Sequence, residues 1–100
     1  MNELTRNIET WAQEKSLLTA DPIKQFAKLI EEVGELAEGL NKGKVDLAID
    51  GIGDCYVVLT ILARQIGTSI DECVLFAYNE IKDRKGKTIN GVFVKENDLT

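Results

Sequence analysis

Apolar residues recur at helical spacing in four segments of the chain, residues 2–16, 22–40, 45–66 and 70–84. Two of these segments carry start signals. Asp21 followed by Pro22 matches an N-cap and first helical position, and Ser69 opens an S-x-x-E capping box. Short loops separate the segments. The pattern therefore predicts a four-helix antiparallel bundle, a single all-α domain spanning residues 1–100.

The third predicted helix is apolar on most sides between Leu47 and Ala63. A bundle of this size cannot bury such a helix completely, so we expect the excess to pack against another subunit. After the last helix, "KTINGVFVKE" contains an Asn90-Gly91 pair between apolar residues. This pair predicts a short C-terminal extended or hairpin tail.

Composition narrows the functional class. No apolar run approaches the roughly 18 residues needed to span a bilayer, and the first residues lack the features of a signal peptide, so we expect a cytoplasmic protein without membrane contact. The net charge of -5 disfavours nucleic acid as a partner. The absence of histidine excludes histidine-based nucleophilic catalysis and histidine-rich zinc or di-iron sites.

The stretch "LIEEVGELAEGL" places four glutamates on the second predicted helix. At 100° per residue, Glu31, Glu35 and Glu38 form one ridge, and Glu32 lies beside Glu35. Like charges at these spacings repel each other. Taken alone, this acidic face is typical of a solvated helix surface.

The third predicted helix favours a second interpretation of the acidic face, as part of a site that binds a divalent metal ion. Between Leu47 and Ala63 its only charged residues are Asp50 and Asp54, which share one face. Carboxylates in apolar surroundings require a compensating cation, supplied either by lysine or by a bound ion. Clustered carboxylate oxygens select magnesium or manganese over zinc or copper. Gly51 and Gly53 flank this stripe and indicate close approach of a neighbouring helix or a ligand.

Cations gather near the end of the fourth predicted helix, at Lys82, Arg84, Lys85 and Lys87. They are suited to bind the phosphates of a substrate that reaches the acidic site through a metal ion. They also match the ordinary preference of cations for a helix C-terminus. Trp11 on the first helix has two interpretations as well, a core residue, which we favour, or a platform on which a base stacks.

The segments "KLIEEVGELAEGL" and "DGIGDCYVVLTILA" together resemble the MazG-like nucleotide pyrophosphohydrolases, the all-α NTP pyrophosphatase group. The family signature is E-E-x-x-E, a spacer, then E-x-x-D. Glu31, Glu32 and Glu35 match its first part, and Asp54 matches the final aspartate. "NEIKDRKGKTINGVF" resembles the tail of compact, phage-type members, so that the resemblance covers roughly residues 8 to 95.

The resemblance implies magnesium-dependent hydrolysis of a nucleoside triphosphate to the monophosphate and pyrophosphate, with Mn²⁺ as a substitute for Mg²⁺. It implies a homo-oligomer, a dimer at least and a tetramer by preference. With this resemblance we predict the metal ligands Glu32, Glu35, Asp50 and Asp54, the catalytic Glu31, and the substrate contacts Gln25, Lys28, Asn79, Lys82, Arg84 and Lys85. The roles of Glu31 and Glu32 are interchangeable in this prediction.

The chain departs from the family pattern at one position. Gly51 stands where E-x-x-D has its glutamate, and Asp50 is the residue able to substitute for it. Two alternatives to an enzyme therefore stay open. One is a non-catalytic nucleotide-sensing protein derived from the family, and the other is a helical interaction module whose acidic face only maintains solubility.

Overall fold

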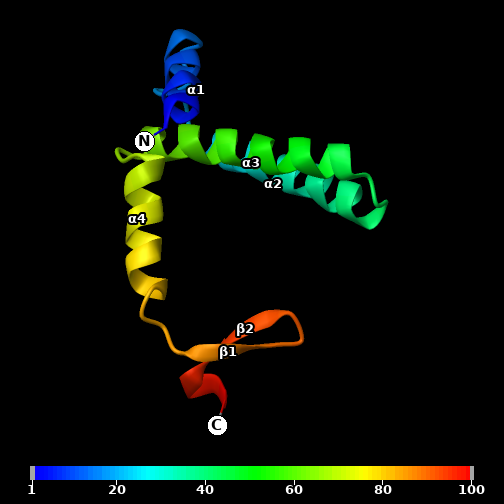
Figure 1. Ribbon diagram of the computed structural model, residues 1–100. Helices are drawn as coiled ribbons and strands as arrows, with labels where there is room; N and C mark the ends of the chain where they lie inside the picture. The colour runs from blue at the N-terminus through cyan, green and yellow to red at the C-terminus, as the bar shows by residue number, and fades with distance from the viewer. Residues whose placement is uncertain (1, 100) are drawn as a thin grey trace.

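A computed structural model describes residues 2–99. Four α-helices come first, followed by a two-stranded antiparallel sheet and a 3₁₀ helix (Figure 1). In chain order the elements are α1 (Glu3–Glu14), α2 (Pro22–Asn41), α3 (Val45–Gln65), α4 (Ile70–Ile81), β1 (Gly86–Ile89), β2 (Val92–Lys95) and η1 (Glu96–Leu99).

Local chemistry sets the helix boundaries. The side chains of Asn2, Asp21 and Ser69 each accept a hydrogen bond from a backbone N–H of the first helical turn. Gly67, just after α3, has a φ of +91°, a conformation that an L side chain rarely adopts. The predicted caps of α2 and α4 and the glycine stop after α3 are therefore confirmed.

Helices α2 and α3 lie side by side along their whole length (Figure 1). Two glycines make this close packing possible. A Cβ atom at Gly39 would stand 3.0 Å from the backbone nitrogen of Ala48, and one at Gly51 would stand 3.0 Å from Leu36 Cβ. Both glycines are buried. The close approach predicted for the two glycines of α3 is confirmed for Gly51, whose neighbour is α2. It is wrong for Gly53, which is exposed and has no atom within 4 Å of its Cβ position.

Helix α1 packs across α3 near its C-terminal end (Figure 1). The hydroxyl groups of Thr5 and Tyr56 lie 2.8 Å apart, and Thr5 is buried. The Arg64 guanidinium donates two hydrogen bonds to the Glu9 carboxylate, one from Nε and one from Nη2. This bidentate ion pair and the buried Thr5 fix α1 on α3.

The C-terminal part of the chain, residues 70–99, forms an arm. Within this arm, α4 contacts α3, whereas the two strands contact each other and η1. The strands pair with Gly86 opposite Lys95 and Ile89 opposite Val92. Asn90 and Gly91 both have positive φ, as a two-residue hairpin turn requires. The chain therefore contains the hairpin that the Asn90-Gly91 pair predicts.

The prediction of an all-α, four-helix antiparallel bundle is wrong. The protein is mostly helical but includes the β1–β2 sheet, and within residues 2–99 only the α2–α3 pair runs along a shared length. Helices α1 and α4 project to opposite sides of one end of α3 (Figure 1). Helical periodicity predicts which residues share a face but not which element covers that face, so four amphipathic helices did not define a bundle.

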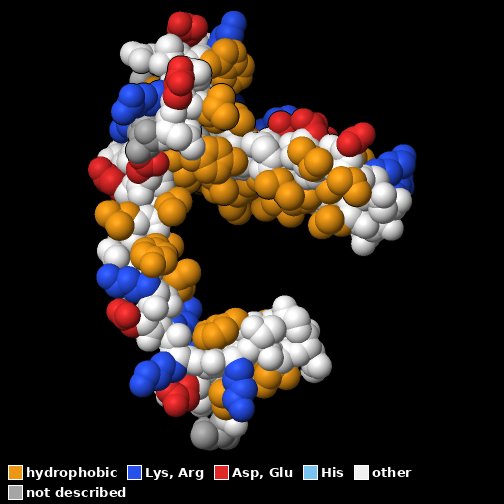
Figure 2. Space-filling model, viewed as in Figure 1, with side chains coloured by type: hydrophobic (Ala, Val, Ile, Leu, Met, Phe, Trp, Pro, Cys, Tyr) orange, Lys and Arg blue, Asp and Glu red, His pale blue; other side chains and the backbone are white. Residues whose placement is uncertain are grey.

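The apolar stripe of α2 also shows that periodicity does not predict which element covers a face. Its larger members point away from α3 and are about half exposed or more, namely Ile23, Phe26, Ile30, Val33 and Leu40. Figure 2 shows hydrophobic side chains along the concave side of the molecule, between the α2–α3 pair and the arm. The buried apolar core is small, consisting of Ala12, Ala48, Val58, Ile61, Ala63 and Ile70.

The overall dimensions agree with this open arrangement. The radius of gyration is 16.3 Å, whereas a compact domain of this length has roughly 13 Å. Among the helices formed within residues 2–99, none combines the length and the apolar content needed to cross a membrane.

Candidate functional site

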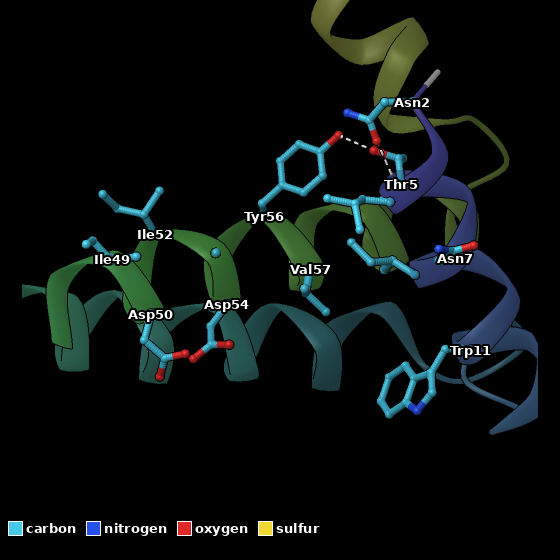
Figure 3. Close-up of a pocket in the computed structure, with 13 residues that line it drawn as sticks. Asn2, Thr5, Asn7, Trp11, Ile49, Asp50, Ile52, Asp54, Tyr56 and Val57 are labelled. Carbon is cyan, nitrogen blue, oxygen red and sulfur yellow. Dashed lines mark hydrogen bonds between the residues drawn. The ribbon is translucent and has the colours of Figure 1, made fainter. Parts of the chain in front are cut away.

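Carboxylates from α2 and α3 converge where the two helices pack. Glu32 lies on the side of α2 that faces α3 and keeps only 7% of its surface exposed. Asp54 is half-buried on α3, and Asp50 is exposed one turn before it. The two aspartate side chains point toward each other (Figure 3). The structure therefore brings three of the four predicted ligands, Glu32, Asp50 and Asp54, near one another.

Glu32 is the most unusual member of this group. Lys28 Nζ lies 3.3 Å from Glu32 Oε1, whereas Glu32 Oε2 is buried without any hydrogen-bond partner. Leaving a buried charged oxygen unpaired is costly, and such groups in folded proteins commonly mark a functional site or an ion. Glu32 therefore presents a buried carboxylate oxygen without a hydrogen-bond partner among residues 2–99, inside the carboxylate group.

The electrostatics of the group follow from its geometry. Burial raises the pKa of Asp54, and the neighbouring Asp50 and Glu32 raise it further. The pKa of Glu35 is raised chiefly by the charge of Glu32. Both shifts show carboxylates crowded together with too little positive charge between them.

Lys28 is the cation nearest to this group. Besides Glu32, its ammonium lies 3.6 Å from Glu31 Oε1. Its pKa is raised, first by the hydrogen bond to Glu32 and then by the charges of Glu31 and Glu32. Lys28 was predicted to contact substrate, and it lies beside the predicted catalytic Glu31. Gln25, the other predicted contact on α2, is half-buried two turns before Glu32.

The residues fit a hard divalent cation by their chemistry. Within residues 2–99, no three His, Cys, Asp or Glu side chains already stand in a metal-holding arrangement. The donors are nonetheless carboxylate oxygens, which Mg²⁺ and Mn²⁺ prefer. The unpaired Glu32 oxygen and the raised pKa of Asp54 indicate a deficit of positive charge. Glu35 and Asp50 are exposed, so their side chains have room to turn toward an ion.

The predicted substrate contacts of the C-terminal arm do not join this site within one chain. Asn79, Lys82, Arg84 and Lys85 are all exposed. Helix α4 contacts α3 but not α2, and the sheet lies apart from both (Figure 1). Arg84 and Lys85 instead line a shallow pocket with residues of β2 and η1. The arm holds its cations away from the carboxylates of its own chain.

Gly51 explains the departure from the E-x-x-D pattern in structural terms. A Cβ atom there would meet Leu36 at 3.0–3.3 Å, closer than most real contacts. A glutamate at this position would force α2 and α3 apart. Restoring the family residue by Gly51→Glu is therefore expected to disturb the helix pair rather than to complete the ligand set.

A pocket of about 930 Å³ lies between α1 and α3. Asp50 and Asp54 line one part of it, and Trp11 lines another (Figure 3). Sequence reasoning missed most of the other lining residues, among them Asn7 and Val57. Helical spacing carried a signal for both, because Val57 follows Asp54 by three positions and Asn7 precedes Trp11 by four.

Comparison with known proteins yields a phage relative of unknown activity. Over 66 residues the chain is 50% identical to the "uncharacterized 18.2 kDa protein in rep-hol intergenic region" of Haemophilus phage HP1 (strain HP1c1). The match covers 65% of this chain and 40% of the relative, so the chain spans less than half of that protein's length. No protein-family model and no solved structure matches the chain.

Proposed function

We propose that this protein is a magnesium-dependent nucleoside triphosphate pyrophosphohydrolase. In this reaction a water oxygen bonds to the α-phosphorus, the bond from that phosphorus to the bridging oxygen breaks, and the nucleoside monophosphate and pyrophosphate leave. The observation that carries the proposal is the buried, unpartnered Oε2 of Glu32 inside a group of carboxylates from two helices. The resemblance to MazG-like enzymes in residues 28–63 supports the same reaction.

Four carboxylates would hold the ion, those of Glu32, Glu35, Asp50 and Asp54. When bound, magnesium would neutralise phosphate charge and lower the pKa of a nearby water. Glu31 would orient that water and accept its proton, because its side chain is 60% exposed and stands beside the Lys28 ammonium. Lys28 and Gln25 would contact the phosphate chain from the same helix face.

The site would be completed by a second copy of the chain in a homo-oligomer, a dimer at least and a tetramer by preference. The chain exposes 7490 Å², whereas a compact monomer of 11.1 kDa exposes about 5,700 Å². The excess of about 1,800 Å² exceeds the roughly 800 Å² that each partner contributes to a standard interface. Exposed apolar side chains, such as Phe26 on α2 and Phe76 on α4, supply suitable surface.

In such an assembly the arm of one copy would lie against the carboxylate site of another. Asn79, Lys82, Arg84 and Lys85 would then bind the phosphates that the acidic residues alone would repel. Opposite charges on the two surfaces favour this docking over the contact of like surfaces.

Pyrophosphate release is the direct test of the activity. The purified protein should release pyrophosphate from at least one canonical or modified nucleoside triphosphate, and chelation of magnesium should stop the reaction. Release of inorganic phosphate alone would contradict the proposal, since it would place the broken bond elsewhere. A protein that hydrolyses none of the nucleotides would also contradict it.

Thermal unfolding tests the metal ligands without relying on turnover. Magnesium or manganese should raise the melting temperature, because a ligand that binds the folded state stabilises it. The double variant Glu35→Gln, Asp54→Asn should lose this rise. A variant with Glu80→Gln on the arm is the matched control and should keep it. An equal rise in the double variant would show that these residues do not hold the ion.

A non-catalytic nucleotide-binding protein is the second candidate. The observation in its favour is Gly51, where the packing against Leu36 leaves little room for the missing glutamate. This candidate predicts that nucleotides with magnesium raise the melting temperature while no pyrophosphate appears. The two candidates are separated by turnover alone.

A further inference from the structure

The pocket between α1 and α3 extends the carboxylate site with a surface of different chemistry. Its volume of about 930 Å³ lies within the roughly 300–1,000 Å³ typical of small-molecule sites. Asp50 and Asp54 give it an acidic end, and most of the remaining lining is apolar. A ligand that fills it should be charged at one end and flat and apolar at the other.

Trp11 provides a flat surface at the end away from the aspartates. Its indole points to the same side of α3 as Val57 and the two aspartates (Figure 3). The residue is 48% exposed, which contradicts its interpretation as a core residue. Its helix is already held to α3 by Thr5 and Glu9, so the ring is not needed for that contact.

A polar side chain accompanies the ring. Asn7 precedes Trp11 by one helical turn and also lines the pocket. Its carboxamide offers both donors and an acceptor, as the hydrogen-bonding edge of a nucleobase requires. The Thr5 and Tyr56 hydroxyls, which also line the pocket, already bond to each other.

We infer that this pocket binds the nucleobase of the substrate, stacked on the Trp11 indole with its polar edge toward Asn7. The phosphates would then extend along α3 toward Asp50 and Asp54. The inference rests on the proposed function for the identity of the ligand, a nucleoside phosphate. It adds the site that distinguishes a nucleotide from a simple polyphosphate, because stacking needs an aromatic base.

Intrinsic fluorescence tests the stacking directly, because Trp11 is the only tryptophan in the sequence. Nucleoside monophosphates with magnesium should quench the emission in a saturable manner, with excitation at a wavelength that the bases do not absorb. Ribose 5-phosphate, which carries the same phosphate without a base, should cause no quenching. An equal response to both ligands, or a response to neither, would overturn the inference.

Kinetics provide the second readout. Loss of base stacking typically weakens binding by about 5- to 150-fold, so Trp11→Ala should raise KM by a factor in this range while kcat changes much less. Trp11→Phe, which keeps a ring, should recover most of the loss. Ile66→Ala removes an exposed apolar side chain outside the pocket and should leave KM unchanged. A KM unaffected by Trp11→Ala would overturn the inference.

The failures of the two proposals can be distinguished. If the parent releases pyrophosphate but nucleotides leave Trp11 fluorescence unchanged, the pocket assignment fails and the activity stands. If base-dependent quenching occurs without any turnover, the activity fails and the base pocket stands. Emission that changes with protein concentration and not with nucleotide would mean that a second copy covers the ring, which also overturns the inference.

Discussion

The α2–α3 pair and the C-terminal arm use their apolar residues in different ways. In the pair, small residues such as Gly39, Ala48 and Gly51 bring two helices into contact along their length. In the arm, Ile70 is buried at the start of α4, whereas Val74, Leu75 and the rest of that helix are exposed. One chain is sufficient to form the first region. The second leaves nearly all of the apolar side chains of α4 exposed.

Under the proposed function, this difference would divide the predicted site between two chains. The carboxylates are positioned by contacts within one chain, because Glu32 is fixed between α2 and α3. The cations Lys82, Arg84 and Lys85 are carried by a region whose own position depends on α3 alone. The proposed acidic ligands and the proposed phosphate contacts thus lie in separate regions of the chain. Mutations in the two regions should therefore have different effects.

The largest expected effect comes from a carboxylate of the α2–α3 pair. Asp54→Asn should reduce pyrophosphate release about a hundredfold, since losing one group that stabilises the transition state costs on the order of 3 kcal/mol. Asp83→Asn, in the arm, is the control and should retain near-parental rates. Initial rates at saturating nucleotide across a magnesium titration would measure both. An Asp54→Asn variant as fast as the parent would remove this residue from the site.

Mixing two inactive variants tests whether the site is shared. A chain with Asp54→Asn and a chain with Lys82→Ala, Arg84→Ala and Lys85→Ala should each be nearly inactive. After exchange of subunits, mixed dimers should recover about a quarter of parental activity, because half of the dimers then hold one intact site. Each variant incubated alone for the same time is the control. No recovery despite proven exchange would assign both sets of residues to one chain.

Substitution of the glycines of α3 should have a smaller effect, which is on stability. At Gly51 a new methyl group would meet Leu36, whereas nothing lies within 4 Å of the Cβ position at Gly53. Gly53→Ala should therefore gain up to about 1 kcal/mol from helix propensity. Gly51→Ala should be less stable than Gly53→Ala by about 1–3 kcal/mol because of overpacking. Denaturant unfolding of the two variants measures the difference, and equal stabilities would contradict the close approach of α2.

The smallest expected effect is a difference in pKa between two glutamates of α2, Glu35 and Glu38. The hydrogen bond and charge of Lys42 lower the pKa of Glu38 below its ordinary value of 4.5, whereas Glu32 raises that of Glu35. Titration of the carboxyl signals by NMR should show Glu38 ionising at lower pH than Glu35. Lys42→Ala should raise the pKa of Glu38, and Lys24→Ala, almost four helical turns away, should not.

The sign of the pH effect follows from the lowered pKa of Glu38. In the folded protein this group ionises at lower pH than in the unfolded chain, so its stabilisation is present above the unfolded pKa. The contribution is lost as the pH falls through the folded pKa. Because the pair is exposed, the effect on stability is small and should weaken with added salt. A parent and a Lys42→Ala variant with identical acid unfolding would show that the pair contributes nothing.

Much of the local structure was predictable from the sequence. The helix boundaries at Asp21 and Ser69, the glycine stop at Gly67 and the hairpin turn at Asn90 depend on residues close together in the chain. The grouping of Glu32 with Asp50 and Asp54 was also predicted. This prediction also used local information. The glutamates share one face of α2, the aspartates share one face of α3, and a short loop joins the two helices.

The packing of whole helices was not predictable in the same way. The apolar stripe of α2 that includes Phe26 and Ile30 indicated a buried face, yet the face against α3 carries Glu32 and Gly39. Periodicity records that a stripe is apolar, but an adjacent subunit can cover it as well as the same chain can. Trp11 illustrates the same point, since its place in the pocket depends on how α1 crosses α3.

The sequence by itself determined where α2 and α4 begin, where α3 ends, where the hairpin turns, and which carboxylates share a face. These properties arise from backbone conformation and from the 3.6-residue repeat, which act over a few neighbouring residues. Only the tertiary structure decided that Glu32 is buried with an unpaired oxygen, that Gly51 packs on Leu36, and that the arm stands apart from α2. These properties depend on the relative placement of elements distant in sequence, which close packing of side chains selects.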